Sequence, residues 1–305
     1  MACAQPIFEM KFFRQALFLF SALWVLGSLS GCAVRPFILS NVADALVSQA
    51  QDFEDDIYLA RDASAFYLKL SESVLRETPG NLKLAESVAA GFTQYAYAFV
   101  SFEADQIQSK DAKAAQRMKE RAARLYARAH RHAMLALETS TPGFTKALTQ
   151  AGPGATLRLT EAQVGVAYWA AAAWGGMISL SKDDPDTVAD LPLAMKLAKL
   201  AWETKPGHGR GSLSSLMGTF EAASPGGSLV LAEKYFDQAI VQSKGQSAGP
   251  WVAKAESIAM AKQDAALFEQ WLKEAIRISA AHRNLENEVM RARAAWLLET
   301  MDDLF

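Results

Sequence analysis

The stretch of sequence that decides the fold runs from Thr160 to Ser181 and reads TEAQVGVAYWAAAAWGGMISLS. Between Val164 and Ile178 it contains no charged residue, and a helix over that segment is about 22 Å long. The hydrocarbon core of a bilayer is about 30 Å thick, so the stretch is too short to span a membrane comfortably. The sequence therefore predicts a buried helix at the centre of a globular fold.

Three large aromatic residues, Tyr168, Trp169 and Trp174, lie in this stretch among alanines and glycines. At about 100° per residue they point in three directions, so other helices must cover the stretch on all sides. Two interpretations stay open. The rings either fill the core, which is the commoner role of large aromatics, or line a ligand cavity between helices. We take Tyr168, Trp169 and Trp174 as candidate ligand-lining residues.

The composition of the whole chain suits a globular protein with a large core. It has 305 residues, of which 51% are hydrophobic and 21% charged. Nothing in the formal net charge of −2 suggests nucleic-acid binding, so we expect no nucleic-acid partner. The two cysteines, Cys3 and Cys32, provide neither a disulfide framework nor a multi-cysteine metal site. Packing must therefore stabilise the fold.

The first 31 residues are typical of a secretory signal peptide. Lys11 and Arg14 precede an apolar stretch, QALFLFSALWVLGS, that is short for a membrane span. The motif Leu29-Ser30-Gly31-Cys32 follows and resembles the bacterial lipobox, in which the cysteine thiol takes a diacylglycerol before the signal is removed. We therefore expect a periplasmic protein that is lipid-anchored through Cys32. Ala33 after the cysteine favours outer-membrane sorting, by resemblance to enterobacterial lipoproteins.

The mature chain reads as a succession of helices, because no run of alternating β-branched residues predicts a strand. Besides the central helix, the expected helices cover residues 39–49, 54–77, 82–106, 110–138, 144–149, 193–204, 210–222, 228–243, 250–262, 265–279 and 285–298. We expect an all-α fold, with residues 32–305 forming a single helical-repeat domain.

The later helices come as short pairs with a recurring pattern of small and large residues. The spacing fits the second helix of a tetratricopeptide unit, in which small residues lie where two helices cross. The matching positions are Ala194, Ala198 and Ala201 with Pro206, then Ala232, Phe236 and Ala239, and more loosely Phe268, Leu272 and Ala275. The sequence predicts divergent tetratricopeptide-like hairpins around the central apolar helix. A non-repetitive bundle with alanines at the crossings is the alternative.

No arrangement of catalytic residues stands out. There is no G-x-S-x-G motif for a nucleophilic serine, and Gly207-His208-Gly209-Arg210-Gly211 lacks the spacing of a phosphate-binding loop. His130 and His132 lie two apart on an expected helix and so point away from each other, which argues against a metal site. We expect no enzyme, no cofactor and no metal, and we interpret the glycine cluster as a turn between helices.

One electrostatic pattern lies on the helix expected at residues 110–138. Five arginines recur at helical spacing and form one stripe: Arg117, Arg121, Arg124, Arg128 and Arg131. The stripe is either a solvated helix face or a docking face for an acidic partner. We take the five as candidate partner-binding residues and expect Arg121 and Arg128 to face solvent.

Several short motifs are spread along the mature chain. They are Gly31-Cys32-Ala33-Val34, Tyr168-Trp169-Ala170 through Ala173-Trp174-Gly175, Ile178-Ser179-Leu180-Ser181-Lys182-Asp183-Asp184-Pro185, Val188-Ala189-Asp190-Leu191-Pro192, Ser224-Pro225-Gly226-Gly227, Gly249-Pro250-Trp251-Val252 with Ala255-Glu256-Ser257, and Arg291-Ala292-Arg293-Ala294-Ala295-Trp296-Leu297-Leu298. Together they resemble the T component associated with tripartite ATP-independent periplasmic (TRAP) transporters, a family of helical bacterial lipoproteins.

The resemblance implies a homotrimer, a pore or cavity through each protomer, and partnership with the transporter's P component, the periplasmic solute-binding protein. On that basis the expected function is to work beside the solute-binding protein and to pass on a small apolar or organic-acid ligand. The alternative is an envelope scaffold lipoprotein that holds no ligand.

Overall fold

The computed structural model describes residues 56–150 and 157–305. Over these residues the chain is helical and contains no strand, so the expected all-α fold is confirmed. The signal peptide, the lipobox cysteine Cys32 and the helix expected at residues 39–49 lie outside the described residues. None of the described helices is both long and apolar enough to cross a membrane.

Most of the helices lie close to the predicted ranges, but the sequence predicts no helix at residues 185–189, and a π turn divides the helix expected at residues 250–262. Their bounds are α3 (Ile57–Glu77), α4 (Leu82–Ala96), α5 (Phe102–Ile107), α6 (Ala112–Ser140), α7 (Phe144–Thr149), α8 (Glu161–Ser179), α9 (Pro185–Ala189), α10 (Leu191–Thr204), α11 (Ser212–Ala223), α12 (Leu229–Gln242), α13 (Gly249–Lys254), α14 (Met260–Lys262), α15 (Ala265–Ala281) and α16 (Leu285–Glu299). Turns of other helical types join some of them: the π-helical η1 (Tyr97–Ser101) and η3 (Ala255–Ala259), and the 3-10 helices η2 (His208–Gly211) and η4 (Met301–Asp303).

Side-chain caps fix where several helices begin. Asn81 accepts a hydrogen bond from the backbone N–H of Leu84 at 3.0 Å, which starts α4 where the sequence predicts. At the start of α8, Thr160 and Gln163 form a reciprocal capping box. Both caps satisfy backbone N–H groups that the first turn of a helix leaves without a partner.

The helix expected at residues 82–106 is interrupted by a π turn. Helix α4 continues into η1 and then into α5, and the dihedral angles stay helical at both junctions. A π turn adds a residue to the helical repeat and so changes the direction of the side chains that follow. Tyr97 inside the turn and Phe102 just after it both contact Arg293, far away in the sequence.

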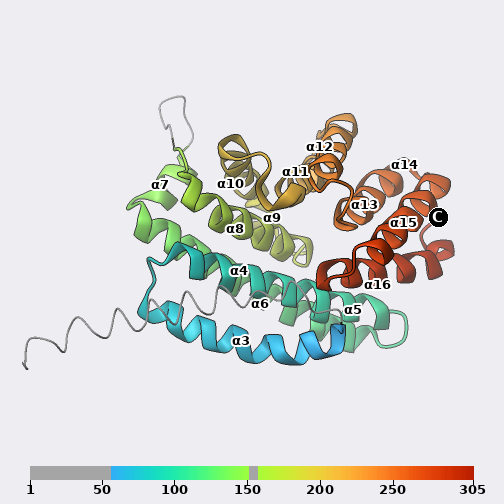
Figure 1. Ribbon diagram of the computed structural model, residues 1–305, viewed down its shortest axis with the longest axis horizontal. Helices are drawn as coiled ribbons and strands as arrows, with labels where there is room; N and C mark the ends of the chain where they lie inside the picture. Colours follow the sequence, from blue (N-terminus) through green and yellow to red (C-terminus); the bar gives the residue numbers. More distant parts are fainter. Residues whose placement is uncertain (1–55, 151–156) are drawn as a thin grey trace, which may run out of the picture.

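Helix α8 is the buried centre that the sequence predicts. It packs against α4 and α6 on one side and against α10 on the other (Figure 1). A Cβ atom on Gly175 would lie 2.7 Å from the Phe220 ring, and one on Gly176 would lie 2.8 Å from the Tyr126 ring. The two glycines therefore let large rings of α11 and α6 pack directly on the α8 backbone.

The helices after α9 pack mainly on their neighbours in sequence, most extensively α11 on α12 and α15 on α16. Apart from Pro206, which is exposed, the residues that carry the repeat spacing are fully buried: Ala194, Ala198, Ala201, Ala232, Phe236, Ala239, Phe268, Leu272 and Ala275. Helical hairpins in this register require such burial at their crossings. The tetratricopeptide type of the repeat stays a prediction.

One arginine ties the last helix to the first half of the chain. The Arg293 side chain of α16 is only 13% exposed and donates hydrogen bonds to Glu256 of η3 at 2.6 Å and to Asp105 of α5 at 3.3 Å. Its guanidinium carbon also lies 5.9 Å from the centre of the Trp296 ring. Arg293 therefore joins α5, in the first half of the described chain, to η3 and α16 in the second half.

Candidate functional site

Two of the candidate ligand-lining residues meet near the N-terminal half of α8. The rings of Tyr168 and Trp169 lie 4.7 Å apart, edge to face. Tyr168 is 9% exposed and Trp169 is half-buried. The ring of His208 lies 5.7 Å from that of Tyr168, so the structure brings η2 to this part of α8.

His208 reaches Tyr168 because the turn between α10 and α11 has an unusual backbone. Gly209, Arg210 and Gly211 all adopt positive φ angles, of 63°, 52° and 101°. A side chain at Gly211 would place its Cβ 2.4 Å from the carbonyl oxygen of Ala239, so only glycine fits there. The glycine cluster is thus a turn between helices, as the sequence predicts, and it also positions a histidine.

A carboxylate that sequence analysis did not single out completes this region. Glu86 of α4 lies against the α8 backbone, where a Cβ on Gly165 would come within 2.1 Å of its carboxyl carbon. Its Oε1 atom is 3.9 Å from His208 Nε2, too far for a hydrogen bond. No periodicity in the sequence indicates that Glu86 belongs to this site, because its neighbours there lie in helices distant along the chain.

Burial shifts the protonation equilibria of this group of residues. Desolvation raises the pKa of Glu86 and also raises the pKa of Tyr168. Desolvation lowers the pKa of His208, and the positive charge of Lys205 lowers it further. The group therefore offers a half-buried carboxyl, a tyrosine hydroxyl and a histidine that favours its neutral form. We call Glu86, Tyr168, Trp169 and His208 the α8 cluster.

Trp174, the third candidate residue, lies in a different environment. It is 7% exposed, and its ring centre is 4.4 Å from that of His130. Its indole Nε1 donates a hydrogen bond to Asp190 at 3.3 Å, and His130 Nδ1 lies 3.2 Å from the carbonyl oxygen of Ala170. Burial lowers the pKa of His130. These contacts are those of a packed core residue.

The arginine stripe of α6 divides into two kinds of residue. Arg117, Arg121, Arg124 and Arg131 are exposed. Arg128 is not: its side chain is 30% exposed and donates two hydrogen bonds to the buried carboxylate of Glu72 on α3. The expectation that Arg128 faces solvent is wrong, because an acidic residue of another helix holds it.

Several basic side chains contact the Glu72 carboxylate. Besides Arg128, its carboxylate lies 2.7 Å from Lys69 Nζ, 2.8 Å from His132 Nε2 and 3.1 Å from Arg76. Burial alone would raise the pKa of Glu72, but hydrogen bonds from Arg128, Lys69 and His132 outweigh it and hold the pKa far below its usual range. This ion-pair cluster joins α3 to α6.

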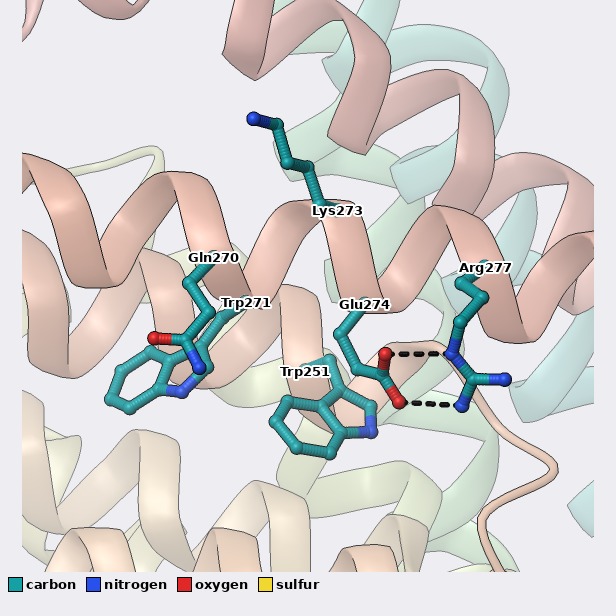
Figure 2. A pocket seen from close by; sticks show the side chains of 6 residues that line it. All are labelled: Trp251, Gln270, Trp271, Lys273, Glu274 and Arg277. Atoms are coloured by element: carbon teal, nitrogen blue, oxygen red, sulfur yellow. Dashed lines mark hydrogen bonds and ion pairs between the residues drawn. The ribbon is translucent and has the colours of Figure 1, made fainter.

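A groove in the C-terminal half was not predicted from the sequence. It has a volume of about 350 Å³ and lies between α13 and α15 (Figure 2). Its lining residues are Trp251, Gln270, Trp271, Lys273, Glu274 and Arg277. Of these, only Trp251 belongs to a motif that the sequence analysis quotes. Among the described residues, no group of three or more His, Cys, Asp or Glu side chains is placed to hold a metal ion.

Comparison with known proteins adds two findings. The family model described as TRAP transporter T-component matches residues 53–305. An uncharacterized protein of Treponema pallidum (strain Nichols) is 26% identical over 279 residues, which cover 87% of this chain and 85% of that protein. The family match includes the α8 cluster, the arginine stripe and the groove.

Proposed function

Because the chain belongs to the TRAP transporter T-component family, we propose that it is the lipid-anchored periplasmic partner of a TRAP solute-binding protein. Family membership gives the association with a TRAP transporter system, and the family is one of transporter components rather than of enzymes. The observation that carries the proposal is the family match, which spans every described helix.

The proposed anchor is the acylated thiol of Cys32, behind the apolar part of the signal sequence. Two or more acyl chains are what stable membrane attachment requires, and a processed bacterial lipoprotein carries them. The protein would then be located in the periplasm, attached to the outer membrane. Its proposed oligomeric state is a homotrimer. Labelling with a fatty-acid analogue, which Cys32→Ala should abolish, tests the anchor separately from the partner.

The proposed docking face for the solute-binding protein is formed by Arg117, Arg121, Arg124 and Arg131 on α6. All four are exposed, so their charges are available to an acidic partner. Arg128 forms an ion pair with Glu72 of α3, so its replacement would disturb the contact between α3 and α6. We therefore leave Arg128 out of the tests of docking.

The proposed ligand position is the α8 cluster, where Trp169, Glu86 and His208 are each partly exposed beside Tyr168. A second candidate function is an envelope scaffold that holds no ligand. One observation favours it: Trp174 is packed against His130 and Asp190 and fills the core.

The experiment mixes the mature protein with the solute-binding protein encoded nearest to it and follows complex formation over a range of salt concentrations. We expect a complex whose association is faster at low salt, because surface charges act mainly on encounter and are screened over about 8 Å at physiological ionic strength. Replacing Arg121 and Arg124 by Glu should slow association at least several-fold. Lys199→Glu, which replaces an exposed cation on α10, is the control.

Absence of a complex at high protein concentration contradicts the proposal. A complex that forms at the same rate with the double Arg variant contradicts only the assignment of the docking face. Trp169→Ala separates the two candidate functions: loss of a co-purifying small molecule supports ligand handling, whereas a protein that carries none before mutation supports the scaffold.

A further inference from the structure

The groove between α13 and α15 lies apart from the α8 cluster, and an inference about it does not depend on the proposed function. Its volume of about 350 Å³ is within the range of small-molecule sites. Figure 2 shows the indole rings of Trp251 and Trp271 on one side and the Glu274–Arg277 ion pair beside them. The groove thus combines flat apolar surfaces with charged groups at one end.

Trp251 carries an unusual polar atom. Its Nε1–H is buried and has no hydrogen-bond partner, and it is the one buried side-chain nitrogen or oxygen in that state within residues 56–150 and 157–305. Buried donors without an acceptor are rare in folded proteins because each loses its hydration without compensation. In Figure 2 this nitrogen lies on the side of the ring that faces Glu274 and Arg277. The donor therefore lies on the Glu274 side of the indole, and it makes no hydrogen bond there.

Arg277 holds that carboxylate in a position in which it does not accept a hydrogen bond from the indole. Arg277 Nε donates to Glu274 Oε2 at 2.8 Å, and its Nη2 donates to Oε1 at 2.6 Å, so both oxygens face the guanidinium. The Arg277 side chain is 67% exposed, and ion pairs of exposed side chains are weak. An anion from solution can therefore compete with Glu274 for Arg277.

Cationic side chains outnumber carboxylates in the lining of the groove. Lys254 Nζ lies 4.5 Å from the centre of the Trp271 ring and is held by Asp237 at 2.7 Å and Glu233 at 3.3 Å. Gln270 adds an amide to the lining. Among the described residues that line the groove, Glu274 is the one carboxylate, and Arg277 already neutralises it. A ligand with an apolar body and a negative charge fits these surroundings better than a cation does.

We propose that this groove binds a small monocarboxylate with a flat or extended apolar body. The ligand carboxylate binds the Arg277 guanidinium in place of Glu274, and the apolar body packs on the two indoles. The released Glu274 carboxylate then accepts the hydrogen bond from Trp251 Nε1. Binding in this way gives the buried indole donor of Trp251 an acceptor.

The test measures binding of phenylacetate to the full mature protein by calorimetry and by tryptophan fluorescence. Phenethylamine and 2-phenylethanol, which carry the same ring with a positive or no charge, are the comparison ligands. We expect phenylacetate to bind and the other two to bind at least tenfold more weakly. Arg277→Gln should weaken phenylacetate binding at least tenfold, and Lys199→Gln, a cation of equal exposure elsewhere, should not change it.

Two further variants separate this arrangement from a general loss of structure. Glu274→Gln removes the anion that competes for Arg277, so it should strengthen phenylacetate binding several-fold. Trp251→Phe keeps a ring but removes the donor, so it should weaken binding while leaving the preference for phenylacetate over phenethylamine. No binding of phenylacetate at millimolar concentration, tighter binding of the amine, or unchanged binding in Arg277→Gln would each overturn the proposal.

Discussion

At the scale of single residues, the packing of the helices depends on a few buried charges whose partners come from other helices. Glu72 is 1% exposed and accepts hydrogen bonds from Lys69, Arg128 and His132. A carboxylate buried without such partners would be strongly destabilising, so the cluster is stable only as a unit. Arg128, which looks like one member of a surface stripe in the sequence, is therefore part of the core connection between α3 and α6.

We predict that Glu72→Gln lowers the free energy of unfolding at pH 7 by about 1–3 kcal/mol, because it leaves several cations around a neutral amide. The folded-state pKa of Glu72 lies below its unfolded value. Its contribution to the free energy of unfolding is therefore fully present above about pH 4.3 and decreases as the pH falls below that value. Urea unfolding at pH 7 and at pH 3 measures this. The difference in free energy of unfolding between Glu72→Gln and the parent should be smaller at pH 3 than at pH 7. Glu103→Gln, on the exposed face of α5, is the control and should have no effect at either pH.

At the scale of helices, close crossings decide how the hairpins fit together. Ala239 of α12 is fully buried, and its carbonyl oxygen lies where any side chain at Gly211 would collide. The α11–α12 hairpin therefore depends on two small residues that face each other. The same turn carries His208 to the α8 cluster, so packing of this hairpin and geometry of the candidate site are linked.

We predict that Ala239→Trp destabilises the protein by about 1–3 kcal/mol or more, because a large side chain cannot enter this crossing without moving α11. Thermal unfolding measures the loss. Val241→Trp is the control, since Val241 is on the same helix and is 76% exposed. Equal melting temperatures for the two variants would show that α12 is packed in a different register.

At the scale of the whole molecule, the described residues bury two apolar cores. One lies around α8 and includes residues from Leu68 to Phe220, and the other lies around α13 and α15 and includes residues from Ala232 to Leu297. Arg293 bridges them, because it binds Asp105 beside the first core and Glu256 beside the second. Burial opposes its charge, but Tyr97 and the two carboxylates raise the pKa of Arg293, which stays charged.

We predict that Arg293→Met lowers the free energy of unfolding by about 3–5 kcal/mol, because it leaves Glu256 and Asp105 together without their shared cation. Differential scanning calorimetry should show the single transition of the parent dividing into two, as the cores unfold separately. Arg131→Met, at an exposed position on α6, is the control. A single unshifted transition in Arg293→Met would mean that other contacts couple the cores.

By itself, the sequence determined the helical class, nearly all helix ranges, the buried centre at α8 and the family. These follow from local signals: apolar spacing, caps such as Asn81, and glycines and prolines between helices. Only the tertiary structure decided that Trp174 is packed while Tyr168 meets His208 and Glu86, that Arg128 is held by Glu72, and that Trp251 faces a groove. Each of these contacts depends on side chains from different helices. No local sequence pattern predicts which distant residue will neutralise a charge or cover a ring.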